Sequence, residues 1–400
     1  MLIVQKFGGS SVANADRIRN VASIITDTYK AGNDVVVVLS AQGDTTDDLI
    51  EKAAEINPNA SKREMDMLLS CGEQMSISLM AMAIEKMGYP VISLTGWQVG
   101  MKTDDNYSAA RIEKIQPVRI ERELDKHRIV LVAGFQGIDS VNDITTLGRG
   151  GSDTSAVALA AVLKADLCQI YTDVNGVYTT DPRICKNAQK LDEISYDEML
   201  ELASLGANVL HNRSVEMAKK YGVEIEVLSS FERSKGTIVK EETEMEKMLV
   251  KGVARDNNVA RIALIEVQDK PGIAFKIFSI LARHNINVDI ILQSIGRNGT
   301  KDISFTVSQD QEAEAVRLLE KHAASIGAKK IDHEDNVSKV SIVGAGMVNN
   351  PGVAAKMFEA LSDEGINIRM ISTSEIKVSV LIDQKDAERA VAAIHDKFIG

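Results

Sequence analysis

The glycine-rich run TLGRGGSDTSA at residues 146–156 constrains the fold more than any other segment. An apolar run at 129–135 precedes it, and alanine-rich residues with high helix propensity follow it. This order predicts a strand, a glycine-rich turn and a helix start, with Ser152 and Asp153 at helix-cap positions and backbone N–H groups facing an anion. Arg149 adds a charge whose planar fork suits a carboxylate or a phosphate. A purely structural turn needs neither Arg149 nor Asp153, so the segment indicates a binding loop, although its spacing is not that of a Walker A motif.

Composition excludes several classes of protein. At 400 residues the chain is long enough for two or three domains, and its net charge of -11 argues against a nucleic-acid partner. Glycines come too early in residues 1–10 for a signal peptide, and apolar runs such as 35–39 are too short to span a membrane. The three cysteines are odd in number and far apart, which is typical of reduced thiols: Cys71, Cys168 and Cys185. We therefore expect a soluble cytoplasmic protein without a membrane partner.

The chain opens on a candidate phosphate site. A β-type run at 2–4 leads into QKFGGSSV at 5–12, and a helical pattern follows. Gly8 and Gly9 at a strand end allow backbone N–H groups to approach phosphates closely, and Lys6 can hold a phosphoryl group during its transfer. A second strand at 34–40 has the continuous valines of a strand buried on both faces, as in a parallel sheet. Polar residues follow it at 41–47, where open α/β sheets bind ligands.

A long helical pattern covers residues 63–87. Glu73 follows Gly72 beside an apolar helix face, which favours a functional role for this carboxylate. The methionines of the same segment are predicted to fill the core: Met75, Met80, Met82 and Met87.

These motifs, in order through the first 240 residues, resemble those of the aspartokinases of the amino acid kinase family. The matching segments are QKFGGSSV (5–12), 40–47, SCGE (70–73), 95–100, GFQG (134–137), 146–156, YTDVNGVYTTDPR (171–183) and 198–207. The resemblance implies an αβα-sandwich kinase domain of the carbamate-kinase-like type. It also implies that MgATP phosphorylates the side-chain carboxylate of L-aspartate to 4-phospho-L-aspartate, the first step of lysine, threonine and methionine biosynthesis.

The resemblance also assigns roles in catalysis and in substrate binding. Lys6 neutralises the transferred phosphoryl group, the backbone of Gly8, Gly9 and Ser10 cradles it, and Asp153 organises the catalytic lysine and the glycine loops. Arg149 is matched to the α-carboxylate of aspartate and Glu73 to its α-ammonium group. The whole predicted aspartate site comprises Ser40, Thr46, Glu73, Phe135, Arg149 and Ser152.

The nucleotide is expected beside the strand at 167–171, with ATP and Mg²⁺ as cofactors and no metal site built by the protein alone. The residues matched to it are Thr172, Asp173, Tyr178 and Arg183. Two positions depart from the family pattern: Asn175 replaces an aspartate, and Asn208 replaces a lysine that in many relatives touches phosphate. Arg183 or Arg213 could substitute for that lysine.

The C-terminal third is an internal repeat. Each copy has a strand, a Pro-Gly pair that opens a helix, and an Ile-Asn pair in a following strand predicted at 286–291 and 366–368. The copies resemble paired ACT domains, which are ferredoxin-like βαββαβ modules that bind small amino acids. The second copy lacks its fourth strand, which we expect from 249–255. The predicted domains are a kinase domain at 1–240, a charged linker at 241–248, a first ACT domain at 261–335, and a second at 249–256 plus 338–400.

The ACT resemblance implies feedback inhibition by lysine, threonine or both, bound where modules of two chains meet in a homo-oligomer. In some relatives an internal start near the linker yields a shorter regulatory subunit. One predicted effector site combines residues of both repeats: Asp269, Gly272, Ala274 and Gln293 with Asn367 and Ile368. The other comprises Met347, Val353, Ala354, Ser372, Thr373 and Glu375.

Two other readings stay open at this point. The first is a kinase of the same fold that acts on glutamate, N-acetylglutamate or a nucleoside monophosphate. The second is an amino-acid sensor whose kinase half has decayed, against which the intact Lys6, Glu73, Arg149 and Asp153 argue.

Overall fold

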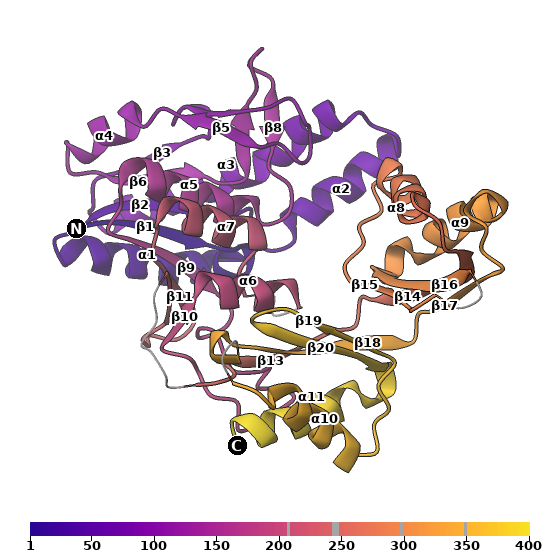
Figure 1. Ribbon diagram of the computed structural model, residues 1–400. Coiled ribbons are helices and arrows are strands. Elements are labelled where there is room, and N and C mark those ends of the chain that lie inside the picture. Colours follow the sequence, from indigo (N-terminus) through magenta and orange to yellow (C-terminus); the bar gives the residue numbers. More distant parts are fainter. Residues whose placement is uncertain (206–208, 242–247, 297–298, 348–349) are drawn as a thin grey trace. The chain divides into compact units, whose positions relative to one another are not determined.

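The computed structural model in Figure 1 describes residues 1–205, 209–241, 248–296, 299–347 and 350–400. The chain forms two compact units. Within the described residues, the N-terminal unit holds Met1–Tyr178, Lys190–Ser204 and 209–241. The C-terminal unit holds Thr179–Gln189 and the chain from 248 onward.

The N-terminal unit is built on an eight-stranded sheet of order β10-β12-β11-β9-β1-β2-β6-β3. Its pairs are parallel, except for β11 with β12. The strands are β1 (Leu2–Phe7), β2 (Asp34–Leu39), β3 (Val91–Leu94), β6 (Ile129–Ala133), β9 (Leu167–Thr172), β10 (Glu193–Ser195), β11 (Ile225–Ser229) and β12 (Thr237–Lys240). The valines of β2 are fully buried, as predicted for a strand covered on both faces.

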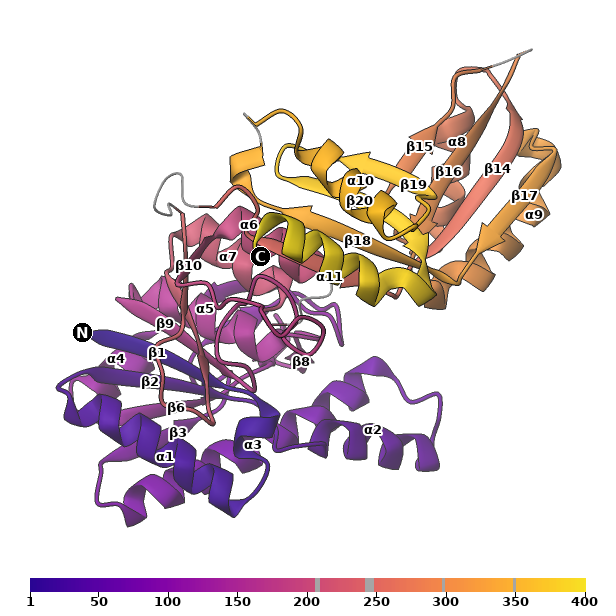
Figure 2. The same ribbon diagram turned by 90° about the horizontal axis from the view of Figure 1, so that it is seen from below.

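Helices cover both faces of this sheet. Side chains of α1 (Ala15–Lys30) and α3 (Lys62–Lys86), which lie side by side in Figure 2, share one core with Val35, Val37 and Leu39 of β2. The alternate residue Val38 faces the other way, towards α5 (Gly151–Leu163). The remaining helices are α2 (Thr45–Ile56), α4 (Val118–Leu124), α6 (Tyr196–Ser204) and α7 (Asn212–Tyr221). This arrangement is the predicted αβα sandwich.

A small second sheet of order β5-β4-β7-β8 stands beside the main one. Its strands are β4 (Met101–Thr103), β5 (Ile112–Ile115), β7 (Gln136–Ile138) and β8 (Ile144–Thr146). The sheet matters for the site because β8 ends immediately before the glycine-rich loop at 147–151.

Helix α3 departs from prediction in its methionines. Met80 is fully buried, but Met75, Met82 and Met87 are 48%, 62% and 41% exposed, so the predicted core role is wrong for these three. The reason is that only one face of α3 packs on α1 and the strands, and methionine tolerates both environments. By length and composition α3 could also cross a membrane, yet 44% of that window is buried within the N-terminal unit.

The C-terminal unit contains two four-stranded antiparallel sheets, of order β15-β16-β14-β17 and β13-β18-β20-β19. The first has β14 (Ala260–Gln268), β15 (Ile291–Gln293), β16 (Thr300–Val307) and β17 (Lys330–Glu334), with helices α8 (Ile273–Arg283) and α9 (Glu312–Ile326). The second has β13 (Gly252–Asp256), β18 (Val337–Val343), β19 (Met370–Thr373) and β20 (Lys377–Asp383), with helices α10 (Val353–Asp363) and α11 (Ala387–Phe398). Both helices of each module share a core with its sheet.

The second strand of each module begins later than predicted. The N–H groups of Ile286 and Ile366 donate to the carbonyls of Leu281 and Leu361 and close the preceding helix. Both isoleucines are buried in their module's core. They are therefore the apolar contact of a helix-ending turn and not strand residues.

The segment expected to complete the second module forms β13, which pairs antiparallel with β18. It occupies the edge position that β17 holds beside β14 in the first module. The missing fourth strand thus comes from the chain upstream of both repeats.

The predicted kinase domain runs unbroken from residue 1 to residue 240, but the segment Thr179–Gln189 belongs to the C-terminal unit. It leaves the N-terminal unit at Tyr178 and returns at Lys190. Its Cys185 is buried in the core of the second module, and the hydroxyl of Thr179 lies 2.8 Å from Nε2 of the fully buried His395.

Replacing Val253 in β13 by alanine should lower the free energy of unfolding of the C-terminal unit by about 2 kcal/mol, because the lost methyl groups leave a cavity. Arg255→Ala in the same strand removes an ion pair to the exposed Glu388 and should cost less than about 1 kcal/mol. Chemical denaturation, with amide exchange in β18 as the local readout, measures both. Equal losses would contradict the buried placement of β13.

Candidate active site

The carboxyl ends of three neighbouring strands build the candidate site. Phe7 of β1 stands in register with Leu39 of β2, and Leu39 with Ala133 of β6. Two further hydrogen bonds continue this alignment: Ser40 N–H donates to the Phe7 carbonyl over 3.1 Å, and Gly134 N–H to the Leu39 carbonyl over 3.0 Å. The loops predicted to bind ligands therefore start at one edge of the sheet.

An ion pair between Lys6 and Asp153 crosses this edge. The Nζ–Oδ1 distance is 2.6 Å, and the two side chains are only 11% and 13% exposed. Asp153 lies in the first turn of α5, where a negative charge is favourable. The helix cap is Gly150, in the left-handed conformation, so the prediction that Ser152 and Asp153 are caps is wrong. Both side chains instead project from the first turn.

The Gly8–Gly9 turn brings backbone close to this ion pair. A Cβ at Gly9 would lie 2.8 Å from the carbonyl oxygen of Ala41, and Gly43 N–H donates to the Gly9 carbonyl over 3.0 Å. A Cβ at Gly8 would lie 3.4 Å from Nζ of Lys6. Ser10 follows in an exposed position. Larger residues would fill the space in which N–H groups can meet a phosphate.

Glu73 is buried at the same edge, with 3% of its surface exposed. Its Oε1 accepts a hydrogen bond from Ala41 N–H over 3.2 Å, while its Oε2 is buried with no hydrogen-bond partner among the described residues. Gly72 permits this approach, because a Cβ there would lie 2.7 Å from that of Ala41. Burial raises the pKa of Glu73 to about 8. A buried carboxyl group with a free oxygen suits a cationic ligand.

Phe135, Arg149 and Ser152 come together around the start of α5. A Cβ at Gly134 would lie 2.8 Å from Oγ of Ser152, and Phe135 N–H donates to the hydroxyl of Ser155 over 3.1 Å. Arg149 is exposed and forms no ion pair within the described part of the chain. Its guanidinium is therefore available to an anionic ligand.

Thr46 lies in the first turn of α2, which follows the Gly43 contact with Gly9. The structure thus places Ser40, Thr46 and Glu73 on elements that converge on the same strand ends as Lys6.

The predicted nucleotide residues are divided between the two units. Thr172 ends β9, with its hydroxyl bonded to the backbone of Val174, and Asp173 and Tyr178 follow in the N-terminal unit. Arg183 lies in the C-terminal unit, where its guanidinium is bidentate on the carboxylate of Asp181. Its role in nucleotide binding stays a prediction.

The other substitute for the phosphate-binding lysine is already engaged. Arg213 donates to the carbonyls of Leu147 and Ala110 over 2.9 Å each, and burial lowers the pKa of its guanidinium. It therefore holds protein backbone. Asn208, which replaces the lysine, lies outside the described residues.

The predicted effector residues occupy equivalent places in the two modules. Gly272 and Gly352 are left-handed caps of α8 and α10, with φ of 88° and 95°. Ala274, Val353 and Ala354 lie in the first turns of these helices, and Asp269 pairs with Lys301 over 3.0 Å.

The rest lie mostly along the second strand of each module. Gln293 belongs to β15, Ser372 and Thr373 belong to β19, and Glu375 follows β19. Asn367 and Ile368 stand between α10 and β19, whereas Met347 is buried in the short helix Ala345–Met347.

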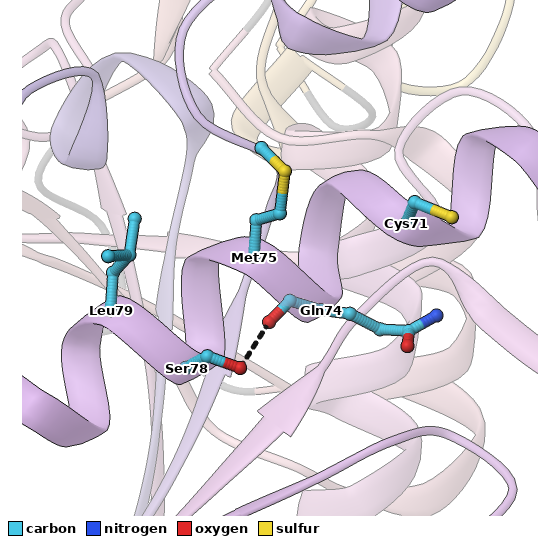
Figure 3. A pocket seen from close by; sticks show the side chains of 5 residues that line it. All are labelled: Cys71, Gln74, Met75, Ser78 and Leu79. Carbon is cyan, nitrogen blue, oxygen red and sulfur yellow. Dashed lines mark hydrogen bonds between the residues drawn. The ribbon is translucent and has the colours of Figure 1, made fainter.

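A shallow surface hollow on α3 is separate from the site (Figure 3). Its lining comes from one helix face: Cys71, Gln74, Met75, Ser78 and Leu79. Their spacing puts this face opposite Glu73.

No group of three His, Cys, Asp or Glu side chains able to hold a metal ion occurs among the residues that the structure describes. The edge of the sheet instead offers a cation, a glycine turn and a buried carboxyl group, as transfer of a phosphoryl group to a small zwitterion requires.

Comparison with known proteins agrees with this geometry. Residues 1–229 match the amino acid kinase family, and residues 261–324 and 340–398 each match an ACT domain. An aspartokinase from Bacillus sp. (strain MGA3) is 52% identical over 99% of this chain and 97% of its own length.

Two crystal structures of E. coli aspartokinase III align over 100% of both chains at 28% identity. The complex with aspartate and ADP (R-state) gives a TM-score of 0.83, and the complex with lysine and aspartate (T-state) gives 0.80. With the fold, the order of its domains and the full-length relatives in agreement, the chain belongs to the aspartokinases of the amino acid kinase family.

Proposed function

We propose that the strand-end site of this aspartate kinase transfers the γ-phosphoryl group of ATP to the side-chain carboxylate of L-aspartate through Lys6. A carboxylate oxygen attacks the γ-phosphorus, the bond from phosphorus to the β–γ bridging oxygen breaks, and ADP leaves with the electron pair. The observation that carries this proposal is the Lys6–Asp153 ion pair beside the Gly8–Gly9 turn. Asp153 holds the ammonium group in place, and Lys6 offsets the charge on the transferred oxygens.

Aspartate is recognised at its two charged ends. Glu73 has a buried unpartnered oxygen for the α-ammonium group, and Arg149 has an exposed fork for the α-carboxylate. Ser40, Thr46, Phe135 and Ser152 line the space between. The aspartate in the complex of E. coli aspartokinase III supports this choice of substrate.

ATP would bind with its phosphates on Gly8, Gly9 and Ser10 and its nucleoside near Thr172, Asp173 and Tyr178. The ADP in the E. coli complex supports a nucleotide partner. Mg²⁺ usually binds through substrate phosphates with one or two carboxylates, which fits a chain whose described residues form no three-ligand cage. When bound, it neutralises phosphate charge.

The two ACT domains form the regulatory half, for which we keep the proposed limits of 261–335 and of 249–256 plus 338–400. Lysine, threonine or both would bind at the glycine-capped helix starts, whose N–H groups can donate to a carboxylate. The complex of E. coli aspartokinase III with lysine supports an amino-acid effector.

The same modules would hold a homo-oligomer together. Large apolar side chains stand exposed on or near the edge strands and α8: Phe275 at 77%, Ile291 at 51%, Ile295 at 92% and Ile371 at 41%. Covering them with a second copy removes this surface from water. A shorter subunit that starts at Met245 or Met248 would retain β13 and so both complete sheets. The three free thiols suit a reducing cytoplasm.

The hydroxamate assay for acyl phosphate tests the function. Aspartate with MgATP should give product, whereas glutamate, N-acetylglutamate and nucleoside monophosphates should not. Because a nucleoside monophosphate would give a diphosphate and not an acyl phosphate, ADP release is followed in parallel. Acyl phosphate from glutamate or N-acetylglutamate, ADP release that depends on a nucleoside monophosphate, or no product with aspartate would overturn the proposed substrate.

Lys6→Ala should lower kcat by about 100-fold or more, because a preorganised charge on the transferred group is lost. Its aspartate KM should change little. Lys219→Ala is the control, since it removes a lysine from an exposed pair with Asp197 on the surface. Initial rates at saturating ATP measure both variants, and a near-normal kcat for Lys6→Ala would remove Lys6 from the mechanism.

Glu73→Gln should raise the aspartate KM by at least about tenfold, because the ammonium group loses its ionic partner. In the wild type the aspartate KM should fall as pH rises through about 8, where Glu73 ionises in the free enzyme. In the variant this titration should be absent. A pH series of KM for aspartate and for ATP decides, and equal effects on both substrates would show that Glu73 is misplaced.

The stability of the ligand-free protein should change with pH in the opposite sense to aspartate affinity. The folded protein holds a proton on Glu73 between the ordinary pKa of 4.5 and about 8, so the associated stability is complete below 4.5 and is lost as pH rises through 8. Without ligand, the wild type should therefore lose stability relative to Glu73→Gln over this window. Denaturation midpoints at pH 5 and at about pH 8.5 give the comparison.

Millimolar lysine or threonine, alone or together, should inhibit the wild type. Gln293→Ala in β15 or Ser372→Ala in β19 should relieve this inhibition and keep the uninhibited kcat within about twofold, since coupling requires contacts that differ between two states. Inhibition curves at fixed aspartate check both. If the wild type is not slowed under any combination, the regulatory proposal fails.

A further inference from the structure

Asp66 of α3 is a fully buried carboxylate that sequence patterns did not single out. It accepts four hydrogen bonds. Its Oδ2 accepts from the N–H groups of Ser108 (2.9 Å) and Thr146 (2.8 Å). Its Oδ1 accepts from the hydroxyl groups of the same two residues, over 3.1 and 2.8 Å. Such complete pairing is what a buried carboxylate needs, and it ties two distant segments to one helix.

Both segments fix the entry of the glycine-rich loop. Thr146 is the last residue of β8, and Arg149 follows three positions later. Ser108 has a left-handed φ of 67°, and its carbonyl oxygen lies 2.9 Å from where a Cβ at Gly148 would stand. The Thr146 carbonyl in turn accepts a hydrogen bond from Ala110 N–H. Asp66 therefore holds the loop start and the segment packed against it.

A partly buried cation holds the next residue of the loop. Arg213 of α7 donates to the carbonyls of Leu147 and Ala110, the same two strands of chain that Asp66 and Thr146 engage. Asp66 accepts hydrogen bonds from backbone N–H groups of these segments, and Arg213 donates to their carbonyls. Together they fix the orientation in which the loop leaves β8.

Helix α3 also carries Glu73, seven residues after Asp66. Seven residues are two helical turns, so both carboxyl groups lie on one buried face of one rigid element. The helix thus holds the group proposed for the α-ammonium end directly, and the group proposed for the α-carboxylate end through Thr146.

We propose that Asp66 is a positioning residue for amino-acid recognition, setting Arg149 relative to Glu73 so that the two bind both charged ends of one substrate. This inference rests on the roles proposed above for Glu73 and Arg149. The inference extends these roles, because it makes Asp66 on α3 the residue that sets the distance between Glu73 and Arg149.

Four variants test it. Asp66→Ala leaves one buried and one partly buried N–H group without a partner. It should raise the aspartate KM about tenfold or more while the ATP KM stays within about twofold. Thr146→Val removes one hydroxyl at nearly constant shape and should shift the aspartate KM in the same direction by about threefold. Asp66→Asn should stay within about threefold of the wild type, because its oxygen can accept from both N–H groups while its amide donates to hydroxyls that rotate.

Glu198→Ala is the matched control. Glu198 is 2% exposed in α6 and accepts from the N–H and hydroxyl groups of Ser195. It should cost stability and leave the aspartate KM unchanged.

KM values are compared only among the variants that fold. If Asp66→Ala does not fold, Thr146→Val provides the test. An aspartate KM that is unchanged in these variants, or that rises equally with the ATP KM or in Glu198→Ala, would overturn the positioning role.

Amide hydrogen exchange at 146–153 is a second readout that needs no substrate. It should accelerate at least about tenfold in Asp66→Ala and little in Asp66→Asn. If the wild type makes no acyl phosphate from aspartate, the proposed function fails, but amide exchange still tests whether Asp66 holds the loop. Unchanged exchange in Asp66→Ala would overturn the positioning role of Asp66.

Discussion

The ion pair between Lys6 and Asp153 joins the main sheet to the helix α5. Lys6 comes from the strand at the centre of the sheet, and Asp153 from the first turn of the helix that covers one face. Because both are nearly buried, neither charge is stable there alone. The pair therefore requires the parallel register that brings the ends of β1, β2 and β6 to one edge, and that edge is where the glycine turns and the substrate groups converge.

Glu73 shows what such a site costs the fold. Its carboxyl group is removed from water and keeps one oxygen without a partner, which raises its pKa to about 8. A well-satisfied side chain would make the empty protein more stable. In the proposed site this oxygen pairs with the ammonium group of the substrate, so the proposal has the free protein lose stability in exchange for affinity. Asp66, on the same helix face, is the opposite case, with all its hydrogen bonds made inside the protein.

Much of this arrangement could be predicted because it is local in the chain. Valine runs, the Gly8–Gly9 turn and the loop at 146–156 fix strands and turns within a few residues, and Glu73 was conspicuous beside Gly72. Contacts between distant residues were not visible. Asp66 meets Thr146 across 80 positions, and Arg213 meets Leu147 across 66, with no pattern that marks either pair. The exposed methionines were missed for a related reason: periodicity does not show which face of a helix is covered.

The origin of β13 also dictates an order of assembly during synthesis. Its partner strand β18 lies beyond the entire first module, so the ribosome completes that module before the second sheet can close. The excursion Thr179–Gln189 waits longer still, because the Thr179 hydroxyl meets His395 only when the last helix has emerged. Apolar residues of this excursion, Ile184 and Cys185 among them, lack part of their final core until α11 has emerged. A chain of this design is therefore most open to misassembly late in its synthesis, when its catalytic sheet is already whole and its regulatory half is not.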